Sequence, residues 1–177
     1  KYKIKKYKII LEPFKKNTAP AILSSALLKE IPYDQSMIFF PSDNLIGKIN
    51  QFNKSLNSHK KYLSDKNIFI FGIKSTSPSS EYGYFLTKNI SKDINKVDRF
   101  IEKPDKNKAE LIIKKKGYMN SGMFFARKDS IIKNFKNHQY EIFKHCINAV
   151  NKSKIYKNVY YLNKTSFSKL QEISFDY

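Results

Sequence analysis

An acidic residue directly follows one of the most apolar runs in the chain, at a position where chemistry is expected. Asp43 comes just after residues 36–40 (SMIFF), a continuous apolar run typical of a buried parallel strand. A carboxylate there could hold Mg²⁺, which prefers oxygen ligands and often bridges to substrate phosphates. The alternative is structural, because Ser42 or Asp43 could cap a helix that begins near Leu45. Spacing alone favours the cap.

A carboxylate and an amine stand together at the end of another expected strand, at Glu102 and Lys103. A glutamate can accept hydrogen bonds from sugar hydroxyls, and a lysine can hold a phosphate as a point charge. A surface ion pair before Pro104 would give the same tripeptide without any function. By itself the pair is therefore weak evidence for a binding site.

Two short motifs offer further groups to a polar ligand. Asn120-Ser121-Gly122 opens an expected strand, and the Asn120 amide has both a donor and an acceptor for sugar hydroxyls. The same triplet is common in turns. In Tyr82-Gly83, the glycine lets a ligand approach the backbone or simply bends the strand. Each motif is therefore compatible with a sugar-binding site and equally with a plain turn or bend.

Other catalytic templates are absent from the sequence. The three histidines and the single cysteine have no metal-ligand spacing, and they are His59, His138, His145 and Cys146. The sequence contains no G-x-S-x-G elbow, no G-x-x-x-x-G-K-[ST] loop and no G-x-G-x-x-G fingerprint. Nucleophilic hydrolysis and zinc chemistry therefore find no support in the residues.

The elements that must position these side chains alternate along the chain. We expect strands at residues 8–11, 36–40, 67–73, 82–90, 96–101 and 122–127, with a turn at 91–95, and helices at residues 19–29, 45–63, 105–116, 129–135, 140–148 and 166–172. Asn17 or Thr18 could cap the first helix, and Pro20 is tolerated in its first turn. This order favours an α/β fold with a largely parallel sheet, whose ligands sit beyond the carboxyl ends of strands.

Composition limits the class of protein. The 177 residues carry a formal net charge of +19, which raises the question of nucleic acid. Only Arg99 and Arg127 are arginines, however, and the lysines are spread along the chain with many Asn and Ile residues, as an A+T-biased genome would encode. We therefore expect no nucleic-acid partner. The single cysteine fits a reducing cytoplasm, and no apolar run approaches the ~20 residues of a membrane span, so we expect no membrane.

Six short motifs follow one another in order. They are residues 10–21 (ILEPFKKNTAPA), 39–46 (FFPSDNLI), 72–84 (GIKSTSPSSEYGY), 99–105 (RFIEKPD), 117–124 (GYMNSGMF) and 173–177 (ISFDY). Together they resemble the mannose-1-phosphate guanylyltransferase family of nucleotidyl transferases, over nearly the whole chain. The resemblance implies a three-layer α/β/α Rossmann-like nucleotide-diphospho-sugar transferase fold with a mostly parallel mixed sheet, present here as one incomplete domain over residues 1–177.

The resemblance also implies roles and partners. Asp43 would bind Mg²⁺ and act in catalysis, Lys103 would act in catalysis on the sugar phosphate, and Glu102 and Asn120 would bind the sugar. Tyr82 and Gly83 would line the sugar pocket, and Asp176 would lie at the edge of the site. The platform for guanine would consist of Glu12, Asn17, Thr18, Ala19 and Pro20. The partners would be GTP and mannose 1-phosphate, with a homo-oligomer left open.

The implied reaction transfers GMP from GTP to mannose 1-phosphate and releases pyrophosphate. The chain departs from the family pattern at Lys15-Lys16, which replaces Gly-Arg, and at Asn44, which replaces the usual histidine. The opening glycine-rich loop and a later metal-binding aspartate are also missing. We therefore expect a piece of a longer enzyme that does not turn over alone.

Other functions stay open from the sequence. A catalytically inactive homologue could keep the sugar side of the pocket as a binding or regulatory subunit. A relative that uses another base or hexose phosphate fits less well, because the E-P…N-T-A-P-A segment points to guanine. A nucleic-acid binder is supported only by the net charge.

Overall fold

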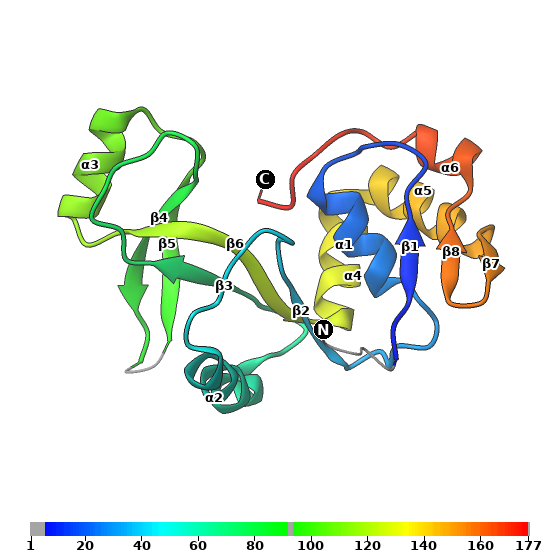
Figure 1. The fold of residues 1–177 in the computed structure, drawn as a ribbon, viewed down its shortest axis with the longest axis horizontal. Helices are drawn as coiled ribbons and strands as arrows, with labels where there is room; N and C mark the ends of the chain where they lie inside the picture. Colours follow the sequence, from blue (N-terminus) through cyan, green and yellow to red (C-terminus); the bar gives the residue numbers. More distant parts are fainter. Residues whose placement is uncertain (1–5, 92–93, 177) are drawn as a thin grey trace. The chain divides into compact units, whose positions relative to one another are not determined.

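The computed structural model describes residues 6–91 and 94–176 (Figure 1). Residues 92–93, within the turn expected at 91–95, and Tyr177, the last residue of the final motif, lie outside this range. The chain divides into two compact units. The first comprises Lys1–Met37, Asn50–Ile68 and Ala126–Tyr177, and the second comprises Ile38–Ile49 and Phe69–Phe125.

The first unit combines packed helices with a small sheet. Its main helices are α1 (Thr18–Ala26), α4 (Lys128–His138), α5 (Tyr140–Asn151) and the short α6 (Lys164–Ser168), and α1, α4 and α5 all contact one another. The side chains of Leu23, Ile131, Cys146 and Phe167 are fully buried and form the centre of this unit. Helix α2 (Ile49–His59), followed by a 3₁₀ turn at Lys60–Tyr62, buries no residue.

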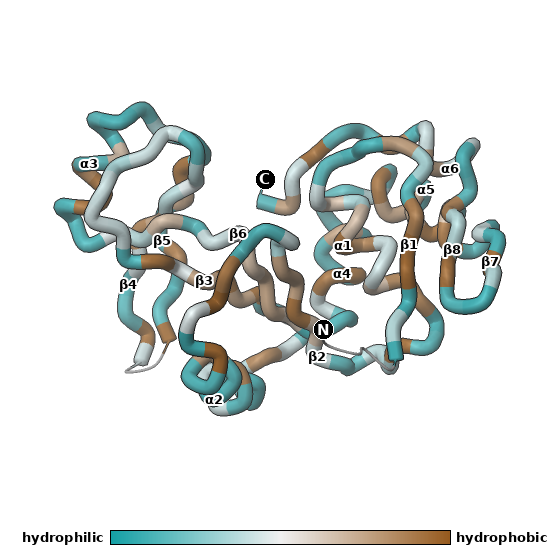
Figure 2. The backbone as a smooth tube through the Cα atoms, in the orientation of Figure 1, coloured by the Kyte–Doolittle hydropathy of each residue, from teal (hydrophilic) through white to brown (hydrophobic). Residues whose placement is uncertain are grey.

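The small sheet has the strand order β1-β8-β7, with β1 at Ile9–Leu11, β8 at Val159–Tyr161 and β7 at Lys154–Tyr156. Strand β1 runs parallel to β8, with Ile10 opposite Tyr160, whereas β7 and β8 form an antiparallel hairpin. Strand β1 is apolar along its length (Figure 2). Sequence reasoning did not expect β7 and β8, because strands of three residues are too short to show a clear period.

The second unit is built on a five-stranded sheet with the order β2-β6-β4-β5, in which β3 also pairs with β6. The strands are β2 (Ser36–Phe39), β3 (Ile68–Ile73), β4 (Tyr84–Asn89), β5 (Asn95–Ile101) and β6 (Tyr118–Arg127). Strand β4 is antiparallel to both β5 and β6. Helix α3 (Lys106–Lys114) packs on β4, and its Ala109 and Ile112 form a core with the fully buried Tyr84.

The expected α/β class is confirmed, with mixed sheets, although the strands are divided between two sheets. Two boundaries differ from expectation in ways that affect the site. The helix expected from residue 45 begins only at Ile49, so neither Ser42 nor Asp43 is its N-cap, and the capping interpretation of Asp43 is wrong. Strand β6 begins at Tyr118, so Asn120-Ser121-Gly122 lies inside this strand and does not open it.

No helix in the described part of the chain is long and apolar enough to cross a membrane.

Candidate functional site

In the first unit, the start of α1 is tied to a segment near the end of the described chain. Asn17 is the N-cap, and its side chain accepts a hydrogen bond from the Thr18 N–H at 2.9 Å. The Ala19 N–H donates to the carbonyl of Ile173 at 3.2 Å, and the Ile173 N–H donates to the carbonyl of Lys16 at 3.2 Å. The first two bonds satisfy the N–H groups of Thr18 and Ala19, which a helix start otherwise leaves open.

Side-chain hydroxyls extend this connection. The Thr18 hydroxyl oxygen accepts from the Phe175 N–H at 2.9 Å and lies 3.2 Å from the Ser174 hydroxyl. Ser174 in turn donates to the Asp176 carboxylate at 2.9 Å. The structure therefore brings Asn17, Thr18, Ala19 and Asp176 together, although Thr18 and Phe175 are 157 positions apart in the sequence.

The backbone of Asn17 adopts an unusual conformation, with φ 67° and ψ −166°. This region is occupied almost only by glycine, and a residue with a side chain pays about 1–3 kcal/mol to stay there. The neighbouring Ala19 and Pro20 point into the core, since Ala19 is buried and the Pro20 side chain is fully buried. Any contact that these two residues make with a ligand would therefore involve their backbone.

Glu12, just after β1, carries an acceptor without a donor. Its Oε1 atom is buried and has no hydrogen-bond partner, and burial raises the pKa of the Glu12 carboxyl above its ordinary value. An unpaired buried acceptor costs about 1–3 kcal/mol and calls for an explanation. Nearby on α5, burial raises the pKa of the Cys146 thiol to about 12, with the Glu12 charge adding to the effect. Cys146 is therefore an inert core residue.

In the second unit, three of the expected sugar-binding residues meet around Gly83. The Asn120 N–H donates to the Gly83 carbonyl at 2.8 Å. A Cβ atom built on Gly83 would lie only 2.6 Å from Glu102 Oε2 and 2.9 Å from Cζ of Phe100. The Glu102 carboxylate thus occupies the space that a side chain at position 83 would need. This close approach, rather than a turn, explains the glycine.

The other two residues expected on the sugar side are more open. Tyr82 is 50% exposed, and Lys103 is exposed with a left-handed backbone at φ 41°. Asn120 itself is buried, and its Oδ1 accepts from the Gly122 N–H at 3.2 Å. The cluster therefore joins a carboxylate and an amide on adjacent strand segments with an exposed amine beside them.

Asp43 lies in the exposed turn that follows β2. Among the described residues, no group of three or more His, Cys, Asp or Glu side chains could enclose a metal ion. Mg²⁺ is commonly held by one or two carboxylates together with substrate phosphates and water, and a single exposed aspartate fits this mode of binding. It does not fit a cage made entirely of protein ligands.

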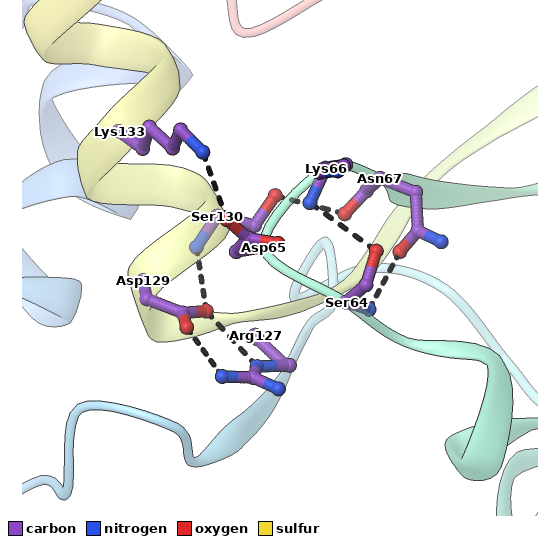
Figure 3. A network of polar contacts seen from close by, with 8 residues as sticks. All are labelled: Ser64, Asp65, Lys66, Asn67, Arg127, Asp129, Ser130 and Lys133. Carbon is purple, nitrogen blue, oxygen red and sulfur yellow. Dashed lines mark hydrogen bonds and ion pairs between the residues drawn. The ribbon is translucent and has the colours of Figure 1, made fainter.

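Sequence reasoning missed a polar network at the start of α4 (Figure 3). Arg127 Nε donates to Asp129 Oδ1 at 3.0 Å, and a second guanidinium nitrogen pairs with Asp129 Oδ2. The buried Ser130 hydroxyl donates to the Asn67 carbonyl at 2.9 Å, and Lys133 pairs with Asp65 at 2.8 Å. The network ties the segment before β3 to α4, and we assign it a structural role.

Lys128 is a second residue that sequence reasoning missed. It is 6% exposed, and its Nζ donates to the carbonyls of Leu28 and Ile31 at 2.8 Å each. Desolvation lowers the pKa of this lysine, and the charge of Glu30 acts in the opposite direction. The periodicity of α4 gave no signal for a buried amine, because a lysine at a helix start is normally read as solvated.

A mixed α/β architecture with polar clusters at strand ends and helix starts is typical of proteins that bind nucleotides or sugars. Residues 1–166 match the nucleotidyl transferase family model, and the chain belongs to this family.

Individual relatives agree with this assignment. The alginate biosynthesis protein AlgA of Pseudomonas fluorescens is 29% identical over 180 residues, which cover 99% of this chain and 37% of the relative. The mannose-1-phosphate guanylyltransferase RfbM of Salmonella typhimurium is 33% identical over 174 residues, covering 96% of this chain and 36% of the relative. The chain therefore spans little more than a third of these proteins.

A solved structure shows the same fold. The crystal structure of mannose-6-phosphate isomerase from Helicobacter pylori superposes with a TM-score of 0.81 at 30% sequence identity, over 94% of this chain and 65% of that one.

Proposed function

We propose that this chain, within a protein of its relatives' length, transfers GMP from GTP to α-D-mannose 1-phosphate, giving GDP-mannose and pyrophosphate. Relatives named for this reaction match 96% of the chain. The structural observation that carries the proposal is the unpaired Oε1 of Glu12, a buried acceptor in the motif expected to contact guanine. Guanine offers N–H donors on its pairing edge, and one of them would satisfy this oxygen.

The base end of the substrate is assigned to the first unit. Glu12 would accept a hydrogen bond from guanine, and the strained backbone at Asn17 would hold the start of α1 for contact with the base. Strain of this kind persists where the surrounding structure enforces it, often at binding sites. The bonds from residues 173–175 to Lys16, Thr18 and Ala19 supply that enforcement.

The sugar end is assigned to the second unit. Glu102 would accept hydrogen bonds from the mannose hydroxyls, and Asn120 would contribute its amide. Lys103 would place a positive charge beside the sugar phosphate, where an exposed amine can follow a mobile anion. Gly83 keeps the space in which the Glu102 carboxylate lies.

The reaction joins two anions, so most of the catalytic work is positioning and charge neutralisation. An oxygen of mannose 1-phosphate forms a bond to the α-phosphorus of GTP while the bond to the β-phosphate oxygen breaks and pyrophosphate leaves. Asp43 would hold Mg²⁺, which neutralises phosphate charge when bound. Lys103 would add a second positive charge on the acceptor side.

The direct test is pyrophosphate release by the native-length protein with Mg²⁺, supplied with each pair of a nucleoside triphosphate and a hexose 1-phosphate. We expect release with GTP and mannose 1-phosphate and much less with ATP or glucose 1-phosphate. A folded protein that binds these ligands but releases no pyrophosphate with any pair would overturn the catalytic proposal in favour of a binding subunit.

Glu12→Gln tests the assignment of the base. Glutamine keeps the size of the side chain and one acceptor oxygen, but it loses the negative charge and presents a donor in place of the second oxygen, so GTP affinity should fall about tenfold or more. Affinity for mannose 1-phosphate should stay unchanged. Equal GTP affinity in the variant and the parent protein would remove Glu12 from the base site.

A further inference from the structure

The turn that carries Asp43 is attached to β6 by one side chain. The Nδ2 atom of Asn44 donates to the carbonyl of Ser121 at 2.9 Å. Both groups belong to the second unit. The bond joins the residue after Asp43 to the residue after Asn120, so it connects the expected metal ligand with an expected sugar ligand.

The acceptor lies next to an irregular position in β6. Gly122, the following residue, has φ +69°, a left-handed conformation, within the continuous strand Tyr118–Arg127. Local side-chain bonds stabilise the irregularity, since Asn120 Oδ1 accepts from the Gly122 N–H and the Ser121 hydroxyl accepts from the Met123 N–H, both at 3.2 Å. Such local side-chain-to-backbone bonds favour an irregular backbone conformation.

The turn and the strand also touch at a second position. A Cβ atom built on Gly122 would lie 3.1 Å from Cγ of Pro41, at the other end of the turn. The turn therefore contacts β6 through Pro41 and is hydrogen-bonded to it through Asn44. Asp43 lies between these two anchors in the sequence.

We propose that Asn44 is a positioning residue that holds the Asp43 carboxylate in register with Asn120, so that metal and sugar phosphate bind cooperatively. The inference rests on the proposed function. Asn44 itself touches neither ligand in this scheme and acts only through the turn. Without its bond, the exposed turn would lose its side-chain hydrogen bond to β6, and more of the ordering of Asp43 would have to take place when the ligands bind.

The test uses Mn²⁺ as a paramagnetic substitute for Mg²⁺ in the native-length protein. Free Mn²⁺ is measured by electron paramagnetic resonance with and without mannose 1-phosphate, and broadening of the Asn120 side-chain amide signal is followed by NMR. Asn44→Ala should weaken Mn²⁺ binding in the presence of mannose 1-phosphate about fivefold to tenfold, as expected for the loss of one hydrogen bond. Asn44→His, which restores an N–H donor, should recover part of the loss.

A matched control separates positioning from general destabilisation. Asn134 in α4 makes a comparable bond, from its Nδ2 to the Ser130 carbonyl at 2.8 Å. Asn134→Ala should therefore leave Mn²⁺ binding and the Asn120 broadening unchanged. Wild-type behaviour of Asn44→Ala in both measurements would overturn the inference, as would a failure of bound Mn²⁺ to broaden the Asn120 signal.

Failure of the proposed function gives a different pattern. If Asp43→Asn binds Mn²⁺ as tightly as the parent protein does, Asp43 is not the metal ligand. The positioning role proposed for Asn44 is then wrong as well. If Mn²⁺ binds through Asp43 but Asn44→Ala changes nothing, only the inference about Asn44 is wrong.

Discussion

Asn17 provides a sharp test of how the first unit is held together. Its φ of 67° and ψ of −166° lie where side chains cost about 1–3 kcal/mol and glycine costs little. At the same time its side chain caps α1 through the Thr18 N–H, a contribution of typically about 1 kcal/mol. Substitution by glycine and by alanine separates the two effects.

The two variants should differ in stability. Asn17→Gly removes the strain and loses only a few tenths of a kcal/mol of capping, although the unfolded chain gains about 0.4–1 kcal/mol of freedom. Asn17→Ala keeps the strain and loses the cap, at a cost of about 1 kcal/mol. We therefore expect the glycine variant to match the parent protein within about 1 kcal/mol and to exceed the alanine variant by about 1–2 kcal/mol.

Urea unfolding followed by far-ultraviolet circular dichroism measures this difference. With a slope of about 1–3 kcal/mol per molar urea, the two midpoints should be separated by about 0.3–2 M. Hydrogen exchange of the α1 amides should likewise be slower in Asn17→Gly than in Asn17→Ala.

A matched position lacks the strain. Asn163 caps α6 with an ordinary backbone, φ −65° and ψ 119°, and its side chain accepts from the Ser166 N–H at 3.0 Å. Both Asn163→Gly and Asn163→Ala should therefore be less stable than the parent protein. Equal stability of the two Asn17 variants would refute the reasoning, because it would mean that the backbone at Asn17 carries no strain that glycine can relieve.

Three further predictions follow from single contacts. Burial raises the folded-state pKa of Glu12, so the stability contributed by its protonated form is present below about pH 4.3 and is lost as pH rises through the folded pKa. In urea titrations, Glu12→Gln should therefore be more stable than the parent protein at pH 7 and equally stable below about pH 4. Gly83→Ala should displace Glu102 and weaken mannose 1-phosphate binding about tenfold or more by calorimetry, whereas Gly72→Ala, whose Cβ would meet the Tyr118 side chain at 2.6 Å, should lower stability and leave affinity intact. Lys128→Met should cost about 1–3 kcal/mol in urea unfolding, because two carbonyls beyond α1 lose their donor; an unchanged midpoint would show that water replaces the amine.

Much of the local structure could be predicted from the sequence. The strands expected at 36–40 and 67–73 were confirmed as β2 and β3, and those at 82–90 and 96–101 as the β4–β5 pair, because apolar runs and turn residues reflect local preferences. The expected burial of the first two was wrong, since no residue of β2 or β3 is buried. The helix expected at 105–116 was confirmed as α3, which Asp105 caps through the Lys108 N–H and which ends before Lys116, a residue with a left-handed backbone at φ 59°. The family was also recognisable, because motif order along a chain needs no folding to be read.

Tertiary structure alone decided how the candidate sites are built. Three features depend on which distant segments come to lie side by side. They are the bond from the Asn44 amide to the Ser121 carbonyl, the unpaired oxygen of Glu12 and the Glu102 carboxylate over Gly83. The same is true of the bonds between residues 16–19 and 173–176, and of the buried amine of Lys128. A sequence specifies which groups are present and how the nearby backbone prefers to turn, whereas burial and hydrogen-bond pairing are set by long-range packing that no local pattern encodes.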